Sequence, residues 1–368
     1  MSRLIEYFTP TPDQIAGLGA AMLVAFALIV LGAAVSRRKS LPEMNLVLGW
    51  AVVGFAYPVF AGLMDIPFRT VAIGLAICTE LPLVIVDVQR GGPSTGLPTK
   101  TEQGDLMQAI YGRNSESPVA VVAPCTPSDC FFMAIEAIRL AAQHMCPVIY
   151  LSDNTLANGA EPWLLPDPAT LPKIELSSLP SSSEFAPYLR DPDTLARPWV
   201  PPGISGLEHR IGGLEKEDVS GEISYDPDNH EHMVRTRQAK IDRIADRIEP
   251  AEVHGDQEGE LLIVGFGGTY GALHQAVNRL RDEGHRVGHM HLRYLNPLQH
   301  NVGEVLSNYQ NVIVAELNGG QLAMLLRSRF LVDCQSLTKM QGVPFKVREV
   351  VEAARKILPG SAQQGVHA

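Results

Sequence analysis

The feature that most constrains this chain is a run of β-branched apolar residues that stops abruptly in a glycine-rich loop. Residues 84–88 read VIVDV, which predicts a strand buried on both faces of a parallel sheet. The next segment, RGGPSTGLPTK at residues 90–100, contains three glycines, two prolines and two threonines. Because ligands of α/β folds bind where such strands end, the sequence predicts an α/β domain with a binding loop at this position.

The chemistry of this loop favours a small anion as its ligand. Arg90 carries a planar guanidinium that can hold a carboxylate through two parallel hydrogen bonds. Glycines let the backbone approach a ligand and prolines stiffen its path, and the loop has both: Gly91, Gly92, Pro93, Gly96 and Pro98. Ser94 and Thr95 have no visible His and Asp partners, so a hydrolase triad is not indicated. An ordinary tight loop between a strand and a helix is the alternative interpretation.

Length, charge and cysteine content limit the class of protein. The 368 residues suit two or three domains, and the formal net charge of −10 argues against general nucleic-acid binding. None of the five cysteines forms a CxxC pair, so we expect no zinc ribbon and no iron–sulfur cluster held by this chain alone. Cysteines in such apolar contexts are typical of a reducing compartment, and we expect the α/β domains to be cytoplasmic.

The N-terminal part differs in composition from the rest. Residues 15–35 and 46–64 are two apolar stretches long enough to cross a bilayer, separated by a basic segment at residues 37–39. This pattern predicts a membrane hairpin, with a pair of buried core helices as the alternative. Since the basic segment should stay cytoplasmic, the hairpin would place the α/β domains on the opposite side. We therefore interpret the hairpin as the product of a fusion.

The pattern of strands, helices and polar stretches divides the chain into four segments. We predict the hairpin at residues 1–72, a partial α/β domain at residues 73–163, a long connector at residues 164–258 and a second parallel α/β domain at residues 259–368. The expected elements of the partial domain are strands at residues 82–88, 118–123 and 147–151 and helices at residues 102–111 and 127–144, the latter capped by Thr126. The connector contains one convincing helix, at residues 231–248.

Three further motifs invite functional interpretations that the residues do not favour. The glycines of GFGGTYG at residues 265–271 suggest a dinucleotide site, but no acidic residue closes a second strand about twenty positions on, as ribose binding requires. The NHEH segment at residues 229–232 suggests a metal, but its two histidines point in different directions, so capping and surface roles are favoured. His209 and Arg210, in the glycine-bounded segment GLEHRIGG at residues 206–213, could reach a phosphate or a partner subunit, but we expect them to take part in structural ion pairs.

With these residues in view, the chain from about residue 74 to residue 357 resembles the α subunit of thiamine-diphosphate-dependent 2-oxoacid:ferredoxin oxidoreductases. The most similar type is the one that acts on 2-oxoglutarate. The segments that carry the resemblance are TELPLV at residues 79–84, QRGGPSTGLPTKTEQGDL at 89–106, YGRN at 111–114, GLEHRIGGLEKED at 206–218, ISYDP at 223–227, LRYLNP at 292–297, ELN at 316–318 and QGVPF at 341–345.

The resemblance implies a fold and a reaction. It implies a partial pyrimidine-binding domain followed by a transketolase-C-terminal-like domain. Such enzymes decarboxylate a 2-oxoacid on thiamine diphosphate, pass electrons to ferredoxin and release an acyl-CoA, which is succinyl-CoA for 2-oxoglutarate. A β subunit shares the thiamine diphosphate and holds its Mg²⁺ and an iron–sulfur cluster. The implied partners are thus a β subunit, ferredoxin, a 2-oxoacid and CoA.

The resemblance also implies which residues bind the substrate and which residue is missing. Arg90 and Thr99 occupy the positions that hold the carboxylate and the keto oxygen of the 2-oxoacid. The glutamate that activates the cofactor should lie upstream of residue 74, and Glu80 and Glu102 occupy other family positions. No catalytic residue is assignable, so we expect an impaired enzyme subunit. The alternative is a membrane-anchored, non-catalytic interaction module or fusion product that keeps the α/β scaffold.

Overall fold

The computed structural model describes residues 68–176 and 180–358. The chain divides into two compact units, Met1–Ile73 and Gly74–Ala368. The predicted membrane hairpin at residues 15–64 lies outside the described residues. Within the described ranges, no helix is both long enough and apolar enough for a membrane crossing. The division into four segments stays a prediction.

The first sheet of the larger unit has four strands in the order β1-β3-β2-β7. β1 and β2 run parallel to β3, and β7, which comes from much later in the chain, pairs antiparallel with β2. The bounds are Leu83–Gln89 for β1, Ala120–Val122 for β2, Pro147–Asp153 for β3 and Tyr294–Asn296 for β7. The sheet is therefore mixed, because a distant strand completes it.

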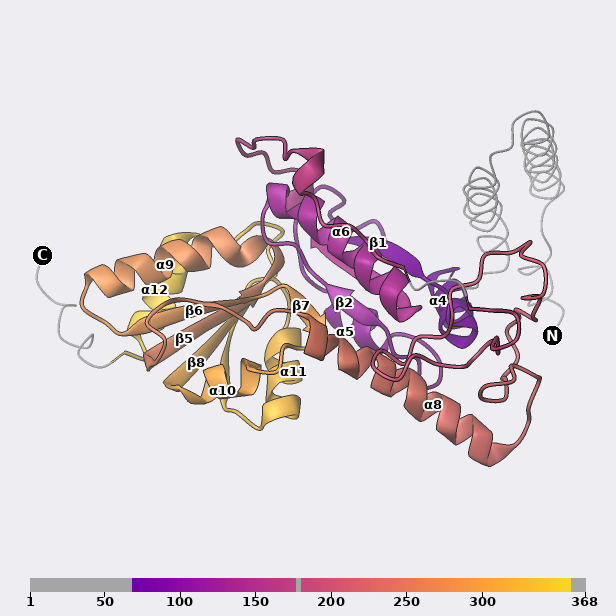
Figure 1. Cartoon of the computed structure of the whole chain (residues 1–368). Helices are drawn as coiled ribbons and strands as arrows, with labels where there is room; N and C mark the ends of the chain where they lie inside the picture. The colour runs from indigo at the N-terminus through magenta and orange to yellow at the C-terminus, as the bar shows by residue number, and fades with distance from the viewer. Residues whose placement is uncertain (1–67, 177–179, 359–368) are drawn as a thin grey trace, which may run out of the picture. The chain divides into compact units, whose positions relative to one another are not determined.

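Helices α5 (Leu106–Tyr111) and α6 (Pro127–His144) pack against this sheet, and α4 (Phe68–Thr79) precedes β1 in the chain (Figure 1). As predicted, Thr126 caps α6, because its side chain accepts a hydrogen bond from the Asp129 N–H. α5 begins at Leu106 rather than at residue 102. The preceding backbone is bonded elsewhere, since the N–H of Asp105 donates to the Gln89 side chain and that of Gln103 donates to the Leu317 carbonyl.

The strand prediction was right for β1 in position but wrong in burial. Val86 is 61% exposed and Val88 is 40% exposed, so one face of the strand is open at its end. The reason lies in the strand order, since β1 stands at one end of the sheet beside β3 alone. β3 lies inside the sheet and is buried along its whole length.

The second sheet has five strands in the order β4-β6-β5-β8-β9. All neighbours are parallel except β4, which pairs antiparallel with β6. The bounds are Val253–Gly255 for β4, Gly259–Phe266 for β5, Val287–Leu292 for β6, Tyr309–Glu316 for β8 and Cys334–Thr338 for β9. The second α/β domain of the prediction is thus present, with one antiparallel strand at its edge.

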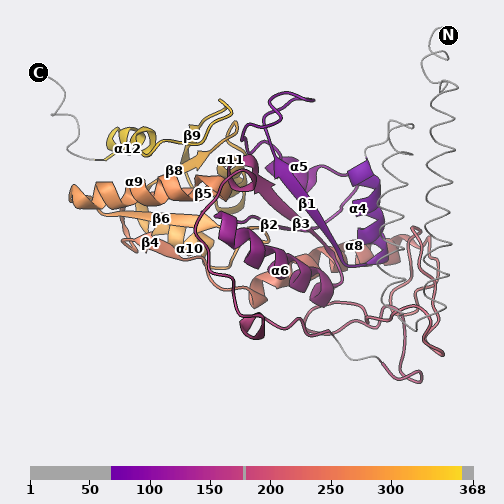
Figure 2. The ribbon, with the colours of Figure 1, turned by 90° about the horizontal axis from the view of Figure 1, so that it is seen from above.

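Helices α9 (Tyr270–Asp282) and α12 (Val347–Arg355) pack against one face of this sheet and against each other. Helices α10 (Val302–Ser307) and α11 (Gln321–Phe330) complete the domain on the side of β8 and β9. Figure 2 shows the two sheets lying beside each other, with α9 and α12 over the second. A buried apolar core fills the space between α9, α12 and the strands, and includes Leu261, Ile263, Leu273, Val277, Ile313, Val350 and Val351.

The connector is fastened to the first domain rather than hanging free. Its helix α8 (Pro227–Asp242) starts earlier than predicted because Asp226 caps it, and it continues as the 3-10 helix η2 (Arg243–Arg247). The short elements α7 (Asn154–Ala157) and η1 (Pro168–Thr170) precede it. Ile241 and Ile244 join α6 and the first sheet in one buried core. A long segment without a sheet of its own is stabilised in this way.

Candidate functional site

The glycine-rich loop follows β1 directly and closes on itself. The N–H of Gly91 donates to the Lys100 carbonyl at 2.9 Å, and the N–H of Leu97 donates to the Gly91 carbonyl at 2.9 Å. Gly96 has φ +41°, and a Cβ there would stand 2.6 Å from the Gly91 oxygen, so this turn requires glycine. Gly91 is buried, whereas the loop from residue 92 to residue 100 is exposed.

Arg90 shapes the loop with part of its guanidinium. Its Nη1 donates to the Thr95 carbonyl at 2.5 Å and its Nη2 to the Ser94 carbonyl at 3.1 Å. A guanidinium carries five N–H donors, so these two bonds leave others for a ligand. Arg90 is exposed at the strand end, and its charge is therefore accessible to an anion. Ser94 and Thr95 contribute their backbone carbonyls to this arrangement.

Thr99 lies at the opposite end of the same loop from Arg90. The bond between Gly91 and Lys100 brings the two ends together. The Thr99 hydroxyl has no hydrogen bond to any residue that the structure describes, and its side chain is exposed. The loop therefore presents one guanidinium and one free hydroxyl at the same strand end, although no direct contact joins the two side chains.

Two distant segments support the loop from outside. The Nδ2 of Asn154 donates to the carbonyls of Pro98 at 3.2 Å and of Lys100 at 3.3 Å. A Cβ at Gly342 would stand 2.9 Å from the Lys100 Cβ and 3.1 Å from Leu97, so the loop packs closely on this glycine. Asn154 begins α7 and Gly342 follows β9, so both domains hold the loop in place.

Sequence reasoning missed the residue that joins the two domains behind the loop. Gln103 is fully buried, and its Nε2 donates to the Phe266 carbonyl at 2.8 Å and to Asp153 Oδ2 at 3.2 Å. Its Oε1 accepts from the Leu317 N–H at 3.0 Å. The sequence signal was weak, since a lone glutamine in a polar loop is ordinary. An aspartate that ends a buried strand, as Asp153 does, was the better clue.

The glycines of GFGGTYG serve this junction. The Gly268 N–H donates to Asp153 Oδ2 at 2.7 Å. A Cβ at Gly267 would stand 2.6 Å from Asp153 Oδ2 and from Gln103 Nε2, and one at Gly268 would stand 2.6 Å from Asp153 Oδ1. The carboxylate of the first domain thus occupies the position where a phosphate would lie in a dinucleotide site. These glycines allow two domains to approach each other.

Glu80 is a structural carboxylate. It is 1% exposed and accepts two hydrogen bonds of 2.7 Å from Arg190, and Lys240 donates to it as well. Burial by itself raises the pKa of this carboxyl, but Lys240 and Arg190 lower it to about 2. A carboxylate that stays charged and is held by two cations is unsuited to exchange a proton with a cofactor, which agrees with leaving Glu80 unassigned.

The histidines of the two sequence motifs contact acidic side chains and a backbone carbonyl. His230 contacts Glu215 at 2.7 Å, and His232 contacts Asp218 at 3.1 Å. In the two ranges that the structure describes, no group of three or more His, Cys, Asp or Glu side chains is placed to hold a metal. The ion pair expected for the segment of His209 and Arg210 is not found among the described residues: His209 Nδ1 lies 2.9 Å from the Leu207 carbonyl, and its Nε2 lies 3.4 Å from Arg197 Nη1.

Comparison with known families adds to this geometry. Residues 69–225 match the family model described as "Pyruvate flavodoxin/ferredoxin oxidoreductase, thiamine diP-bdg". Residues 259–356 match the model described as "Pyruvate:ferredoxin oxidoreductase core domain II". The first match contains the Arg90 loop, and the second contains β5, β6, β8 and β9 of the second sheet. The two α/β domains therefore both fall within models of one enzyme class.

Individual relatives are similar over most of the chain. The 2-oxoglutarate oxidoreductase subunit KorA of Mycobacterium tuberculosis is 52% identical over 316 residues, which cover 84% of this chain and 48% of the relative. Subunit alpha of 2-oxoacid:ferredoxin oxidoreductase 2 from Aeropyrum pernix is 33% identical, over 89% of this chain and 52% of the relative. The chain thus spans about half the length of these curated relatives.

A solved structure is also similar. It is 2-oxoglutarate:ferredoxin oxidoreductase from Magnetococcus marinus with 2-oxoglutarate, coenzyme A and succinyl-CoA bound. The match has a TM-score of 0.72 and 32% identity, and it covers 77% of this chain and 50% of that chain. At this identity the likeness extends beyond the fold to the sequence.

The comparisons correct one expectation about the N-terminal part. The matched 84% of the chain is longer than the segment from Gly74 to the C-terminus, so similarity to the M. tuberculosis protein extends upstream of Gly74. The idea that the resemblance begins only near residue 74, after an unrelated hairpin, is therefore not supported. The family models name the pyruvate type and the relatives the 2-oxoglutarate or 2-oxoacid type, and all of them are 2-oxoacid oxidoreductases. The chain belongs to the 2-oxoacid:ferredoxin oxidoreductase α-subunit family.

Proposed function

We propose that this chain acts as the α subunit of a 2-oxoglutarate:ferredoxin oxidoreductase and that its Arg90 loop binds the 2-oxoacid. The observation that carries the proposal is the exposed Arg90 guanidinium at the end of β1, oriented by the Ser94 and Thr95 carbonyls. The reaction is the oxidative decarboxylation of 2-oxoglutarate to succinyl-CoA, with CoA as co-substrate and ferredoxin as electron acceptor.

In this proposal Arg90 and Thr99 divide the recognition of the substrate. The guanidinium of Arg90 takes a carboxylate of the 2-oxoacid through its remaining donors. The hydroxyl of Thr99, which no described residue uses, donates to the keto oxygen. The backbone of Gly91, Gly92 and Gly96 lets the substrate approach the loop closely. A site that binds both groups of the 2-oxoacid orients the bond to be broken.

Thiamine diphosphate is the cofactor that the matching family model names. Its chemistry, when bound, is to stabilise the carbanion left by decarboxylation. The described residues fit only part of this task. Glu80 is held by Arg190 and Lys240, so it is not available to activate the cofactor. We therefore propose no step through the cofactor and expect the chain to bind substrate more readily than it turns it over.

The partners follow from the same proposal. A β subunit would share the thiamine diphosphate and would carry its Mg²⁺ and an iron–sulfur cluster. These roles are what the resemblance implies for the β subunit, and the cysteines of this chain form no CxxC pair that would suggest a cluster site. Co-expression with a β subunit is accordingly the first requirement of any activity assay.

The test uses the full chain, co-expressed with a β subunit of the family. We would measure 2-oxoglutarate binding by calorimetry and 2-oxoglutarate- and CoA-dependent reduction of a viologen dye. Arg90→Ala should weaken binding at least tenfold, whereas Arg348→Ala, a change at an exposed arginine of α12, should not alter it. Binding that is unchanged in Arg90→Ala contradicts the assigned site. A complex that forms with β but neither binds nor turns over substrate would favour a non-catalytic scaffold.

A further inference from the structure

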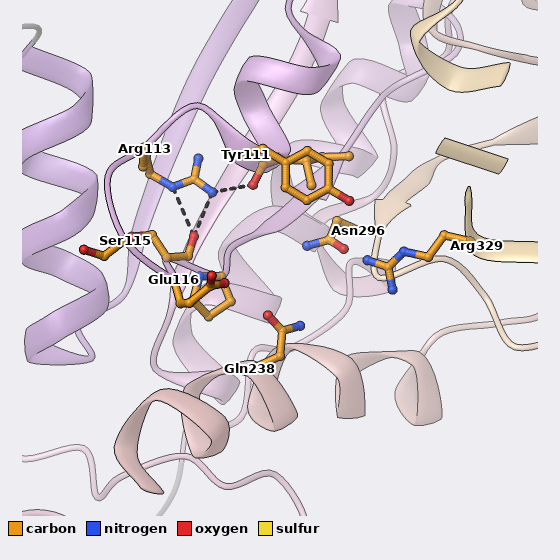
Figure 3. A pocket seen from close by; sticks show the side chains of 10 residues that line it. Tyr111, Arg113, Ser115, Glu116, Gln238, Asn296 and Arg329 are labelled. Atoms are coloured by element: carbon orange, nitrogen blue, oxygen red, sulfur yellow. Dashed lines mark hydrogen bonds between the residues drawn. The ribbon is translucent and has the colours of Figure 1, made fainter. Parts of the chain in front are cut away.

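A second pocket lies away from the Arg90 loop and has a volume of about 200 Å³. Its wall comes from four separate parts of the chain: the end of α5 with the loop after it, α8, β7 and α11 (Figure 3). The polar side chains that matter here are Tyr111, Arg113, Glu116, Gln238, Asn296 and Arg329. Both α/β domains and the connector therefore meet around one small polar space.

The pocket lies near the amino end of β2, whereas the Arg90 loop lies at the carboxyl end of β1. Pro118 lines the pocket and precedes β2, whereas Arg90 follows β1. β1 and β2 are both parallel to β3, so the amino end of β2 and the carboxyl end of β1 lie at opposite ends of the strands. A ligand of this pocket would not contact the proposed 2-oxoacid site, and the pocket is independent of that function.

Arg113 forms the wall of the pocket and is fully engaged. Its guanidinium donates to the carbonyls of Ala109 at 2.8 Å, Ile110 at 2.7 Å and Ser117 at 2.8 Å. Burial lowers the pKa of this guanidinium to about 10, which still leaves it charged at neutral pH. All of these acceptors are neutral, so the positive charge has no carboxylate partner among them.

Arg329 supplies a second cation that is not engaged. It projects from the last turn of α11 toward Asn296 (Figure 3) and is exposed. Its guanidinium has no hydrogen bond or ion pair with any residue in the described ranges. A guanidinium that faces a pocket with all its donors available is suited to a planar anion such as a carboxylate. Glu116 is the acidic side chain of the wall, so the pocket is more basic than acidic.

Two amide oxygens face the same space without a donor. The Nδ2 of Asn296 donates to the Val119 carbonyl at 2.6 Å, and the Nε2 of Gln238 donates to Asp242 at 2.8 Å. These bonds engage the amide nitrogens and leave the Oδ1 and Oε1 atoms as acceptors. The hydroxyl of Tyr111 also has no partner among the described residues. The pocket thus combines a cation with acceptors that need a donor on the ligand.

We propose that this pocket binds a small monocarboxylate that carries a hydroxyl or amino group. The carboxylate takes Arg329, and the hydroxyl or amino group donates to the side-chain oxygens of Asn296 and Gln238. A volume of about 200 Å³ equals on the order of seven water molecules, which suits a molecule the size of lactate or alanine. Two arginines against one glutamate leave a single positive charge, which matches one carboxylate rather than a multiply charged phosphate.

The experiment is calorimetric titration of the full chain with L-lactate, L-alanine and inorganic phosphate as separate probes. We expect saturable millimolar binding of L-lactate or L-alanine and none of phosphate. Arg329→Ala should weaken that binding at least tenfold, and Gln238→Leu should weaken it severalfold. Arg348→Ala is the matched control and should bind as the wild type does.

Arg90→Ala distinguishes this pocket from the 2-oxoacid site, since binding at the second pocket should survive it. Loss of lactate or alanine binding in Arg90→Ala, but not in Arg329→Ala, would overturn the proposal. Phosphate binding that depends on Arg329 would overturn the carboxylate assignment. If none of the three probes binds at concentrations 50-fold above the expected millimolar dissociation constant, the pocket is not a binding site. Lactate binding and not alanine binding would identify the hydroxyl as the donor, and the reverse would identify the amine.

Discussion

Gln103 and Phe266 are 163 positions apart in the chain, yet the Gln103 Nε2 donates to the Phe266 carbonyl at 2.8 Å. The same side chain accepts from the Leu317 N–H at 3.0 Å, so one glutamine pairs with the backbone at the last residue of β5 and directly after β8. The loop that follows β1 is thereby anchored to the second sheet. The position of Arg90 relative to the second domain depends on this buried bridge.

Replacing Gln103 with leucine should destabilise the whole described fold. It leaves the Leu317 N–H buried without a partner, at a cost of about 1–3 kcal/mol, and it removes one of the two side-chain hydrogen bonds to the Phe266 carbonyl, which keeps the Thr269 hydroxyl. We expect a loss of about 3 kcal/mol in the free energy of unfolding, measured by urea denaturation. Gln257→Leu, an exposed site, is the control and should change stability by less than about 0.5 kcal/mol. Equal stability of the two variants would show that the bridge contributes nothing.

Gly268 and Gly271 of the GFGGTYG segment give a second test, because alanine substitutions at these two positions should change stability in opposite directions. A Cβ at Gly268 would stand 2.6 Å from Asp153 Oδ1, so Gly268→Ala forces the two domains apart and should cost about 2 kcal/mol. Gly271, in the first turn of α9, has nothing within 4 Å of such a Cβ. Gly271→Ala should therefore stabilise by up to about 1 kcal/mol through helix propensity. Thermal unfolding of both variants checks the opposite signs.

The lowered pKa of Glu80 predicts that the folded protein loses stability in acid as this carboxylate is protonated. Its pKa falls from 4.5 to about 2 on folding, because Lys240 and Arg190 outweigh the effect of burial. Since the folded pKa is the lower one, the stabilisation by Glu80 is complete above about pH 4.5 and is lost as the pH falls toward 2. Glu80→Gln should lose about 3–5 kcal/mol at pH 7, because Lys240 loses its carboxylate and Arg190 keeps only the longer contact with Asp218.

The control for this prediction is Glu222→Gln, a change at an exposed residue. Urea unfolding of wild type, Glu80→Gln and Glu222→Gln would be compared at pH 7 and pH 3. The stability difference between wild type and Glu80→Gln should shrink at the lower pH, whereas Glu222→Gln should follow the wild type. A difference that stays constant between the two pH values would show that Glu80 is not the titrating group.

Asn154 tests whether the shape of the Arg90 loop matters for substrate binding. Its side chain donates to the carbonyls of Pro98 and Lys100 and so holds the end of the loop that carries Thr99. Asn154→Ala should weaken 2-oxoglutarate binding about fivefold, which corresponds to one lost hydrogen bond of about 1 kcal/mol. Asn158→Ala, four residues on and exposed, should leave the affinity unchanged. Calorimetry on the co-expressed complex makes the measurement.

The parts of the fold that could be predicted are those that depend on residues close together in the sequence. The cap by Thr126 and the α6 helix were found from their own residues, because capping depends on a hydrogen bond three residues away. The β-branched run of β1 identified a strand correctly but could not show that it ends the sheet. Strand order depends on which segments pair across the chain, and β7 joins β2 from about 170 residues later.

The candidate site likewise has some features that the sequence determines and others that only the tertiary structure decides. The sequence alone determined the chemical content of the Arg90 loop, because its guanidinium, glycines and hydroxyls are neighbours in the chain. Only the tertiary structure decided that Gln103, Asp153 and Gly268 meet behind the loop, that Glu80 is held by two cations, and that Arg329 faces a second pocket. Local residues fix which groups a loop can offer, whereas burial and partners depend on segments brought together by folding.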